Sequence, residues 1–298
     1  MTTTGITSGF LLADKPAGWT SHDVVAKVRN LTGGKVGHAG TLDPMATGLL
    51  VLGLGQSTRL LRFTQSFPKT YEATAIFGVA TDSLDADGAV LDRAPLPVTE
   101  KDLADVIDRF TGRIHQMPPM VSARKVEGRR LYELAREGKI VERETRPVDI
   151  YELEILDIAP SDYPEVRFRV VCGTGTYVRT LADDMARALG GRAHLSALRR
   201  TRNGSLGVAD ASSIETIVAA AAGGTLAELV VTPSRALEDL PGVLLDSEYV
   251  RAVRNGAVIP AASVNAPDGS LVRLFDAETL LGVYRVDGQT VTAEVVTP

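Results

Sequence analysis

Residues 38–48 read HAGTLDPMATG and lie between two segments of regular character in this 298-residue chain. Thr20 or Ser21 begins an amphipathic helix, and a glycine pair at residues 33–34 ends it. Residues 49–54, LLVLGL, have the continuous apolar character of a buried strand. Glycine and proline over residues 35–48 indicate a loop without regular structure. A loop on a rigid scaffold presents its side chains outward, so this one is a natural place for chemistry.

Short apolar and amphipathic segments alternate irregularly along the rest of the chain. The expected strands are 9–13, 49–54, 69–81, 148–158, 165–172, 271–275, 280–286 and 289–296. The expected helices are 20–31, 57–63, 99–110, 176–189, 213–222 and 247–256, and residues 118–138 are expected to form a basic loop followed by a helix. Strands in runs with separate helices favour an α+β fold, with a mixed and mainly antiparallel sheet, over a doubly wound parallel sheet. The predicted domains are residues 1–234 and a small β-rich module at 235–298 that begins with a strand at about 235.

The composition is that of an ordinary globular chain, with 44% hydrophobic and 23% charged residues. The single cysteine, Cys172, excludes a disulfide within the chain and a cysteine-rich zinc site. No segment approaches the ~18 consecutive apolar residues of a membrane span, so we expect a cytoplasmic protein. Residues 53–58, GLGQST, lack the lysine and the spacing of a phosphate-binding loop. With no other cofactor motif and no metal cluster evident, we expect neither a cofactor nor a metal.

The formal net charge of −5 argues by itself against a protein that coats nucleic acid. The charge is uneven, however, because residues 14–69, 113–146 and 179–202 each carry a net +4. These three windows sum to +12 and leave −17 on the other residues. If the windows meet in space they form a surface suited to a polyanion, whereas solvated faces explain them equally well when charge is the only clue.

Asp43 is the one ionisable acid in the 38–48 loop. A carboxylate held in a loop can serve as nucleophile, base or metal ligand. The alternative is that Asp43-Pro44 is only a turn, since aspartate before proline commonly forms turns without a catalytic function. From this stretch alone, the turn is the better interpretation.

Further segments must be considered together with this loop. They are GFLLADKPAGWTSHDVVAKVR at 9–29, KTYEATAIFG at 69–78, PPMVSARKVEGRRLYELAREG at 118–138 and CGTGTYVRTLADDMARALGGRAHLSALRRTRNG at 172–204. With HAGTLDPMATG, these segments closely resemble the TruB family of tRNA pseudouridine synthases, in the family's order and over much of residues 9–207. Val121 and Met45 depart from the family pattern, which usually has an aromatic residue and a leucine there.

The resemblance implies a pseudouridine synthase fold with a PUA-like C-terminal module, and an isomerase that converts uridine 55 in the TΨC loop of tRNA to pseudouridine. The target base is flipped out, the N1–C1′ bond breaks, the base rotates while held, and C5 bonds to C1′. This isomerisation needs no redox partner and no external group. The implied partner is the tRNA T arm, without an obligate protein partner, and a monomer suffices for the reaction.

The resemblance also implies roles for particular residues. Asp43 would be the nucleophile or charge stabiliser, Tyr71 would pack on the target base and take part in proton removal, and Arg179 would orient Asp43. The other implied contacts with the substrate are His38, Tyr177, Leu198, Lys15, Arg124 and Lys125, with Arg129 and Arg130 as further phosphate contacts on the basic loop-helix near 113–146.

Each implied role has a plain structural alternative. Arg179 lies four residues before Asp183 and would form a surface ion pair on a helix. The tyrosines and Leu198 would be packing residues, His38 a loop residue without a ligand, and the other cations solvated. For the whole chain, the alternatives are a noncatalytic RNA-binding or tRNA-folding module and, with less support, a nucleotide-dependent enzyme that uses residues 53–58.

Overall fold

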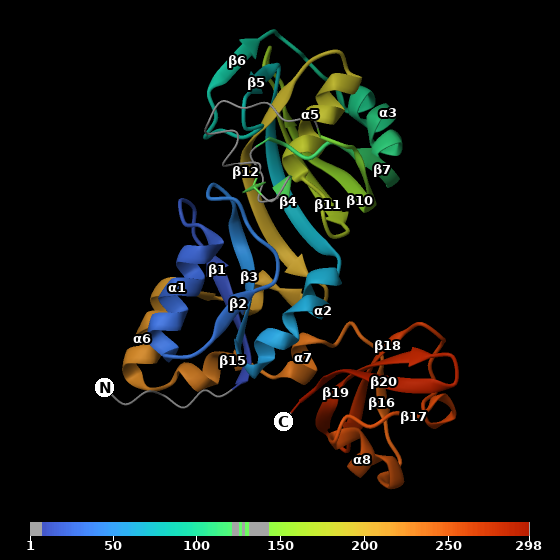
Figure 1. Ribbon diagram of the computed structural model, residues 1–298. Helices are drawn as coiled ribbons and strands as arrows, with labels where there is room; N and C mark the ends of the chain where they lie inside the picture. Colours follow the sequence, from blue (N-terminus) through green and yellow to red (C-terminus); the bar gives the residue numbers. More distant parts are fainter. Residues whose placement is uncertain (1–7, 121–124, 127–128, 131–142, 298) are drawn as a thin grey trace. The chain divides into compact units, whose positions relative to one another are not determined.

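The computed structural model describes residues 8–120, 125–126, 129–130 and 143–297, and the chain forms two compact units (Figure 1). The first unit comprises Met1–Leu42, Leu49–Phe67 and Asn203–Pro298, and the second comprises Asp43–Gly48 and Pro68–Arg202. The short segment that carries Asp43 therefore belongs to the unit built from the middle of the chain.

The first unit is built around strand β1 (Ser8–Lys15), whose neighbour in the sheet is β3 (Thr47–Gly55). Helix α1 (Ser21–Thr32) begins with a capping box at Thr20 and lies beside α6 (Ile214–Gly223), as Figure 1 shows. Both helices bury apolar side chains in one cluster with β1 and β3. The other elements here are β2 (Val36–His38), η1 (Gln56–Arg59), α2 (Leu61–Ser66), β13 (Leu206–Gly207), η2 (Val208–Asp210), β14 (Ser212–Ser213), η3 (Leu226–Leu229), β15 (Val230–Val231) and α7 (Pro233–Ala236).

A five-stranded sheet forms the C-terminal part of the first unit. Its strand order is β16 (Gly242–Leu244), β18 (Leu271–Asp276), β19 (Thr279–Asp287), β20 (Thr290–Val296) and β17 (Ile259–Pro260). Strand β16 runs parallel to β18 and the other pairs are antiparallel, with α8 (Ser247–Arg254) and η4 (Ala261–Ser263) between them in sequence. Leu280, Val283 and Val295 of this sheet share a buried cluster with Phe10 and Leu49. The C-terminal sheet thus contributes to the core of the first unit.

The second unit has a sheet in the order β12 (Ala193–Asn203), β4 (Lys69–Phe77), β11 (Glu165–Cys172), β10 (Arg146–Ala159) and β7 (Gly112–Gln116). The pairs from β4 to β7 are antiparallel, and β12 pairs in parallel with the first residues of β3. Helices α3 (Glu100–Phe110) and α5 (Val178–Ala188) pack against each other and against the sheet (Figure 1). Strands β5 (Val79–Thr81) and β6 (Val90–Arg93) form a hairpin, as do β8 (Lys125–Val126) and β9 (Arg129–Arg130).

The predicted α+β class with a mixed, mainly antiparallel sheet and a β-rich C-terminal part is confirmed. None of the helices in the described ranges combines the length and the apolar character that a membrane crossing requires. The division into domains at residues 234 and 235 stays a prediction.

Several local predictions are wrong for identifiable reasons. The expected loop 35–48 contains β2, a strand too short to show periodicity, which pairs with residues 52–54 of β3. The expected strand at about 235 is the short helix α7, which starts with a proline in its first turn and a Thr232 cap. No element was expected at 193–203, yet β12 forms there. The arginines of this segment interrupt its apolar pattern, so the sequence does not show the alternation of a strand. The helix expected after the basic loop within 118–138 lies outside the described residues and stays a prediction, and the two pairs described in this stretch are strands β8 and β9.

Candidate active site

Asp43 and Arg179 form a two-point ion pair in the second unit. Arg179 Nε lies 3.0 Å from Asp43 Oδ2, and Nη2 donates a hydrogen bond of 3.0 Å to Oδ1. The Arg179 side chain is 2% exposed, whereas that of Asp43 is 34% exposed. A bidentate guanidinium–carboxylate pair is short, directional and stronger than a neutral hydrogen bond. The buried arginine therefore fixes the orientation of a carboxylate that solvent and a substrate can still reach.

Arg179 is itself held by a second carboxylate. Its Nη1 donates to Asp85 Oδ2 at 3.2 Å and to the carbonyl oxygen of Ser83 at 2.8 Å. Asp85 is 5% exposed, and it also accepts hydrogen bonds from the Ser83 hydroxyl and the Asp87 N–H. A buried cation between two carboxylates is compensated on both sides. Asp85 thereby stabilises Arg179 in the position from which it holds Asp43.

The turn that carries Asp85 has a strained backbone. Leu84, between Ser83 and Asp85, has a φ of 63°, which a side chain of its size rarely adopts. The Leu195 N–H donates to the Leu84 carbonyl at 3.0 Å, and Asp85 forms a bridge with the same strand residue. Strain of this kind persists only where the surroundings impose it, and it is common at functional sites. Strand β12 thus holds Asp85 toward Arg179.

Arg179 does not pair with Asp183, the partner that helical spacing offered as an alternative. Asp183 accepts instead from Nε of Arg187 at 2.8 Å and Nε of Arg192 at 2.7 Å, and from the Ala193 N–H at 3.2 Å. These bonds tie helix α5 to the start of β12. The surface ion pair is therefore the wrong interpretation of Arg179.

The start of helix α5 is held by a buried amide. The Tyr177 N–H donates to Gln116 Oε1 at 3.0 Å, and Gln116 Nε2 donates to the Tyr177 carbonyl at 3.3 Å. Gln116 is 1% exposed, and Tyr177 is the residue that precedes the first turn of the helix. This clamp fixes Tyr177, and with it Arg179 two residues later. The Tyr177 side chain is half-buried.

Tyr71 lies on β4, opposite Val170 of β11, with its side chain half-buried. Burial raises the pKa of the Tyr71 phenol above its usual value, and the Asp43 carboxylate acts in the same direction. Arg200 opposes the rise in this pKa through its charge and as a side-chain hydrogen-bond partner of the phenol. Tyr71 therefore keeps its proton at neutral pH, and it lies within the electrostatic influence of Asp43.

Two buried cations accompany Tyr71 in the sheet. Lys69 is 5% exposed and donates to Thr174 Oγ1 at 3.1 Å, and Arg200 is 1% exposed. Burial lowers the pKa of Lys69 to about 8, and repulsion by Arg200 adds to the decrease. Burial raises the pKa of the Cys172 thiol, the cross-strand neighbour of Lys69, to about 11. Cys172 is thus an inert thiol, whereas Lys69 and Arg200 place positive charge within the sheet that carries Tyr71.

The structure places the other implied contacts in different surroundings. Leu198 is 7% exposed on β12, two residues before Arg200, so both side chains lie on the same face of the strand. His38 ends β2 in the first unit, and its ring makes an edge contact with His22 at 5.7 Å between ring centres. Lys15, also in the first unit, is fully buried, and its Nζ donates to the carbonyl oxygens of Pro16 at 2.9 Å and Trp19 at 2.6 Å. The alternative of a solvated Lys15 is therefore wrong.

The basic loop-helix is only partly described. Arg124 lies outside the described residues, and Lys125, Arg129 and Arg130 are described as parts of strands β8 and β9. Their expected contacts with phosphate stay predictions.

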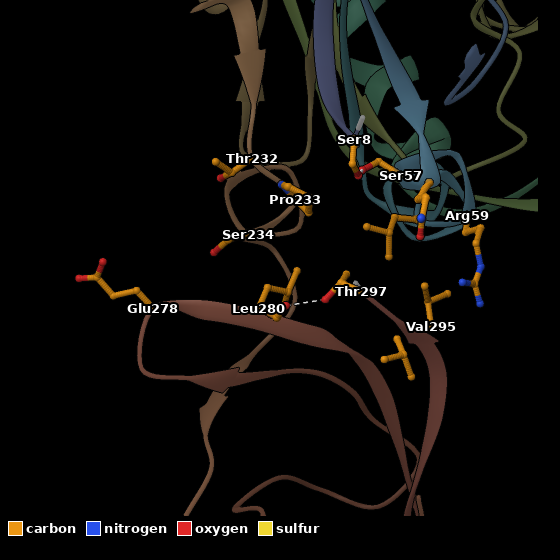
Figure 2. Close-up of a pocket in the computed structure, with 13 residues that line it drawn as sticks. Ser8, Ser57, Arg59, Thr232, Pro233, Ser234, Glu278, Leu280, Val295 and Thr297 are labelled. Atoms are coloured by element: carbon orange, nitrogen blue, oxygen red, sulfur yellow. Dashed lines mark hydrogen bonds between the residues drawn. The ribbon is translucent and has the colours of Figure 1, made fainter. Parts of the chain in front are cut away.

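The first unit contains a separate cavity of about 320 Å³ (Figure 2). Its walls come from the start of β1, from η1, from the residues around the start of α7 and from strands β19 and β20. The Ser8 and Ser57 hydroxyls face each other there at 2.7 Å, and the Thr297 hydroxyl bonds to the Leu280 carbonyl (Figure 2). Its two charged lining residues, Arg59 and Glu278, are exposed. Among the described residues, no group of three or more acidic, histidine or cysteine side chains is arranged to hold a metal ion.

Asp85, Gln116 and Arg200 were not expected from the sequence as parts of this site. Asp85 lies in the acidic stretch 82–92, and it contacts Arg179 from 94 residues away. Gln116 is 61 residues from Tyr177, on a strand with no predicted element. No local pattern signals such partners, because the sheet alone brings them together.

Most of the chain is similar in sequence to known proteins. Residues 27–178 match the model of the TruB family pseudouridylate synthase N-terminal domain, and residues 179–239 match that of the tRNA pseudouridylate synthase B C-terminal domain. The chain is 46% identical over 257 residues to the tRNA pseudouridine synthase B of Geobacillus kaustophilus, covering 84% of this chain and 90% of the relative. It is 41% identical over 294 residues to that of Geobacter sulfurreducens, covering 94% and 96%.

A solved structure is similar over nearly the full length. It is a chain in the structure of an H/ACA RNP bound to a substrate RNA containing 2′-deoxyuridine, with a TM-score of 0.75 and 25% sequence identity. The likeness covers 98% of this chain and 86% of that chain. The arrangement of helices and strands described above therefore recurs in a solved structure.

Proposed function

The chain belongs to the TruB family of pseudouridylate synthases, and from this premise we propose that it isomerises uridine 55 in the TΨC loop of tRNA to pseudouridine with Asp43 at the reacting centre. The observation that supports this role best is the bidentate pair between the partly exposed Asp43 carboxylate and the buried Arg179. A protein that only bound RNA would gain nothing from an oriented carboxylate, since it repels phosphate.

The reaction is balanced within the substrate. The N1–C1′ bond of the target uridine breaks, the uracil turns while it is held, C5 bonds to C1′, and the C5 proton leaves as N1 gains one. Asp43 attacks C1′ or C6, or removes a proton in a route through a glycal. All three routes need a carboxylate that is ionised and aimed at the target, and the two hydrogen bonds from Arg179 favour this state.

Base flipping supplies the target to Asp43. Removing a base from its stack costs a few kcal/mol, and stacking on an aromatic side chain returns about 1–3 kcal/mol per base. We assign this stacking to Tyr71, with the apolar side chain of Leu198 as a further contact. Tyr71 keeps its proton at neutral pH, because burial raises its pKa. In this proposal its phenol acts first as a platform, and it takes part in the proton transfer from C5 only once the substrate has changed its surroundings.

The proposed partner is the T arm of tRNA, bound by a monomer. The tRNA pseudouridine synthase names of the relatives support tRNA as the substrate. The basic residues of the 113–146 segment and the β-rich, PUA-like C-terminal sheet would contact phosphates outside the reacting nucleotide. His38 would touch the RNA backbone, and Tyr177 would line the pocket of the target base. A non-enzymatic role in tRNA folding would use the same surface.

The test is release of tritium from a T-arm transcript carrying C5-labelled uridine, without added metal or cofactor. The parent protein is expected to release one tritium per target uridine, and Asp43→Asn to lower the single-turnover rate by at least about 1,000-fold while the affinity for RNA stays within about threefold. Asp105→Asn, an exposed aspartate of α3, serves as the matched control and is expected to react like the parent. Full activity of Asp43→Asn would refute the role of Asp43, and no release by the parent would refute the function.

A further inference from the structure

Strand β12 carries a buried arginine that the proposed reaction leaves without a role. Arg200 is 1% exposed and leads the fully buried side chains of the described residues in volume. Removing a guanidinium from water is unfavourable unless its surroundings compensate for the charge. Leucine or methionine would fill such a position at a lower cost in free energy. The presence of an arginine therefore needs an explanation, and the contacts of its peptide and of its side chain provide one.

The peptide of Arg200 supports the end of the Asp43 loop. Arg200 pairs in parallel with Gly48, five residues after Asp43, and the intervening chain turns through a hydrogen bond of 3.1 Å from the Ala46 N–H to the Asp43 carbonyl. Gly48 has a φ of 99°, and a Cβ atom there would lie 2.3 Å from the Arg200 carbonyl oxygen. Only glycine permits this approach. The position of the loop is therefore fixed against the main chain of Arg200.

The side chain of Arg200 reaches the other proposed participant. Strand β12 is the neighbour of β4 in the sheet, and the Thr201 hydroxyl donates to the Thr70 carbonyl at 3.4 Å. Arg200 comes one residue before that contact on β12 and Tyr71 one residue after it on β4, and the guanidinium acts on the phenol both as a charge and as a hydrogen-bond donor, which lowers the pKa of Tyr71. Arg200 has no acceptor, so it donates and the phenolic oxygen accepts. The Tyr71 hydroxyl is thus held from one side while its proton can face another group.

We propose that Arg200 is a positioning residue for the isomerisation, because its peptide holds the Asp43 loop while its guanidinium holds the Tyr71 hydroxyl, so that one residue sets the distance between carboxylate and phenol. The inference rests on the proposed function and adds a residue to it. A flipped uracil must meet Asp43 at its reacting atom and Tyr71 at its ring in the same complex. A misplacement of about 1 Å between such groups can cost about 100-fold in rate.

The side-chain half of the proposal is tested by single-turnover pseudouridine formation with saturating T-arm RNA. Arg200→Met is expected to lower the rate by about 30- to 100-fold, and Arg200→Lys by about tenfold because a lysine keeps the charge but lacks the planar fork. The affinity for RNA should stay within about threefold in both. Arg169→Met removes a half-buried arginine of the same unit, whose partners are Glu152 and Glu154, and should behave like the parent.

A purely structural role is separated by a double-mutant cycle. If Arg200 acts through the Tyr71 hydroxyl, Arg200→Met should cost no more than about threefold in a Tyr71→Phe background, far less than in the parent. An equal loss in both backgrounds would overturn the proposal. Parent-like rates of Arg200→Met would also overturn it. If thermal unfolding shows that Arg200→Met does not fold, parent-like rates of Arg200→Lys would overturn it. The activity of the parent protein tests the proposed function itself. A failure of that function can therefore be distinguished from a failure of the proposal for Arg200.

The backbone half is tested at Gly48. Gly48→Ala should lower the single-turnover rate by at least about tenfold, because the added Cβ pushes the loop away from Arg200. Gly190→Ala is the matched control, since Gly190 has a φ of 87° but no atom within 4 Å of an added Cβ. That variant carries the same backbone strain without the collision. Equal rates for the two variants would show that the contact with Arg200 does not position the loop.

Discussion

Arg179 owes its place to two carboxylates that lie far apart in sequence. Asp43 faces solvent and is proposed to react, whereas Asp85 is buried and contacts only protein groups in the described structure. A guanidinium that had Asp43 alone as its partner would be free to turn toward solvent. Because Asp85 also holds the guanidinium, Arg179 presents Asp43 with a single fixed orientation.

Asp85→Asn is expected to slow pseudouridine formation by about 10- to 100-fold at saturating RNA, with little change in RNA affinity. The amide keeps the shape and one acceptor but removes the charge that holds Arg179. Single-turnover kinetics with T-arm RNA would measure the effect. Asp87→Asn, two residues away and exposed, is the matched control. A parent-like rate for Asp85→Asn would show that Asp43 orients Arg179 without help.

Helix α5 shows how one element serves both the site and the fold. Its first turn carries Arg179 toward Asp43, while Asp183 on the next turn connects the helix to β12 through Arg192 and Ala193. Asp184 follows with a half-buried side chain. Burial raises the pKa of Asp184 to about 6, and the neighbouring Asp183 carboxylate adds to the increase.

The raised pKa of Asp184 gives the stability of the second unit a defined pH dependence. The folded state holds this proton more tightly than the unfolded state, whose pKa is 3.8, so the contribution is fully present below pH 3.8 and is lost as the pH rises through about 6. Asp184→Asn should therefore increase the free energy of unfolding at pH 8 by about 1 kcal/mol, and less at pH 5. Urea denaturation at both pH values measures this, with the exposed Asp157→Asn as the control. An equal effect at both pH values would contradict it.

At the scale of the whole molecule, the C-terminal sheet is a contributor to the core of the first unit. Leu280, Val283 and Val295 lie in the same buried cluster as Phe10 and Leu49, and Arg62 of α2 contacts Glu294 of β20 at 2.7 Å. The sheet also has its own cluster around Leu274 and Tyr284. The strands of this sheet are therefore tied to the N-terminal strands through packing as well as through the chain.

Leu280→Ala is expected to lower the free energy of unfolding of the first unit by about 2 kcal/mol, because it removes a buried side chain from the shared cluster. Leu244→Ala makes the same change in the same sheet at a side chain that is 68% exposed, and it should cost less than about 0.5 kcal/mol. Denaturant unfolding of both variants measures the difference. Equal stabilities would mean that the sheet does not depend on the shared cluster.

The uneven charge of the chain also acts at this scale. Three windows with a net +4 each coexist with a total of −5, so local rather than total charge would attract RNA. We expect the affinity for T-arm RNA to fall by about 10- to 100-fold between 50 and 200 mM salt, as bound counter-ions are released from a few phosphates. The single-turnover rate at saturating RNA should change little. An affinity independent of salt would argue against a phosphate-binding surface.

The sequence by itself determined the class of fold, the order of most elements and the residues closest to the proposed chemistry. Thr20 and Thr99 predicted the starts of two helices, because capping depends on residues within one turn. The 38–48 stretch identified Asp43 through its resemblance to a known loop. Strand β12 was missed, because its alternation is masked by arginines that are buried or partly buried in the folded chain.

Only the tertiary structure decided which partners these residues have. Arg179 could have paired with Asp183 at helical spacing, and it pairs with Asp43 and Asp85 instead. Arg200 reaches Tyr71 and Gly48 from strands that are distant in sequence. Periodicity and capping are local properties that a short window of residues expresses. Ion pairs across a sheet depend on strand order and burial, and these are set only when the whole core has formed.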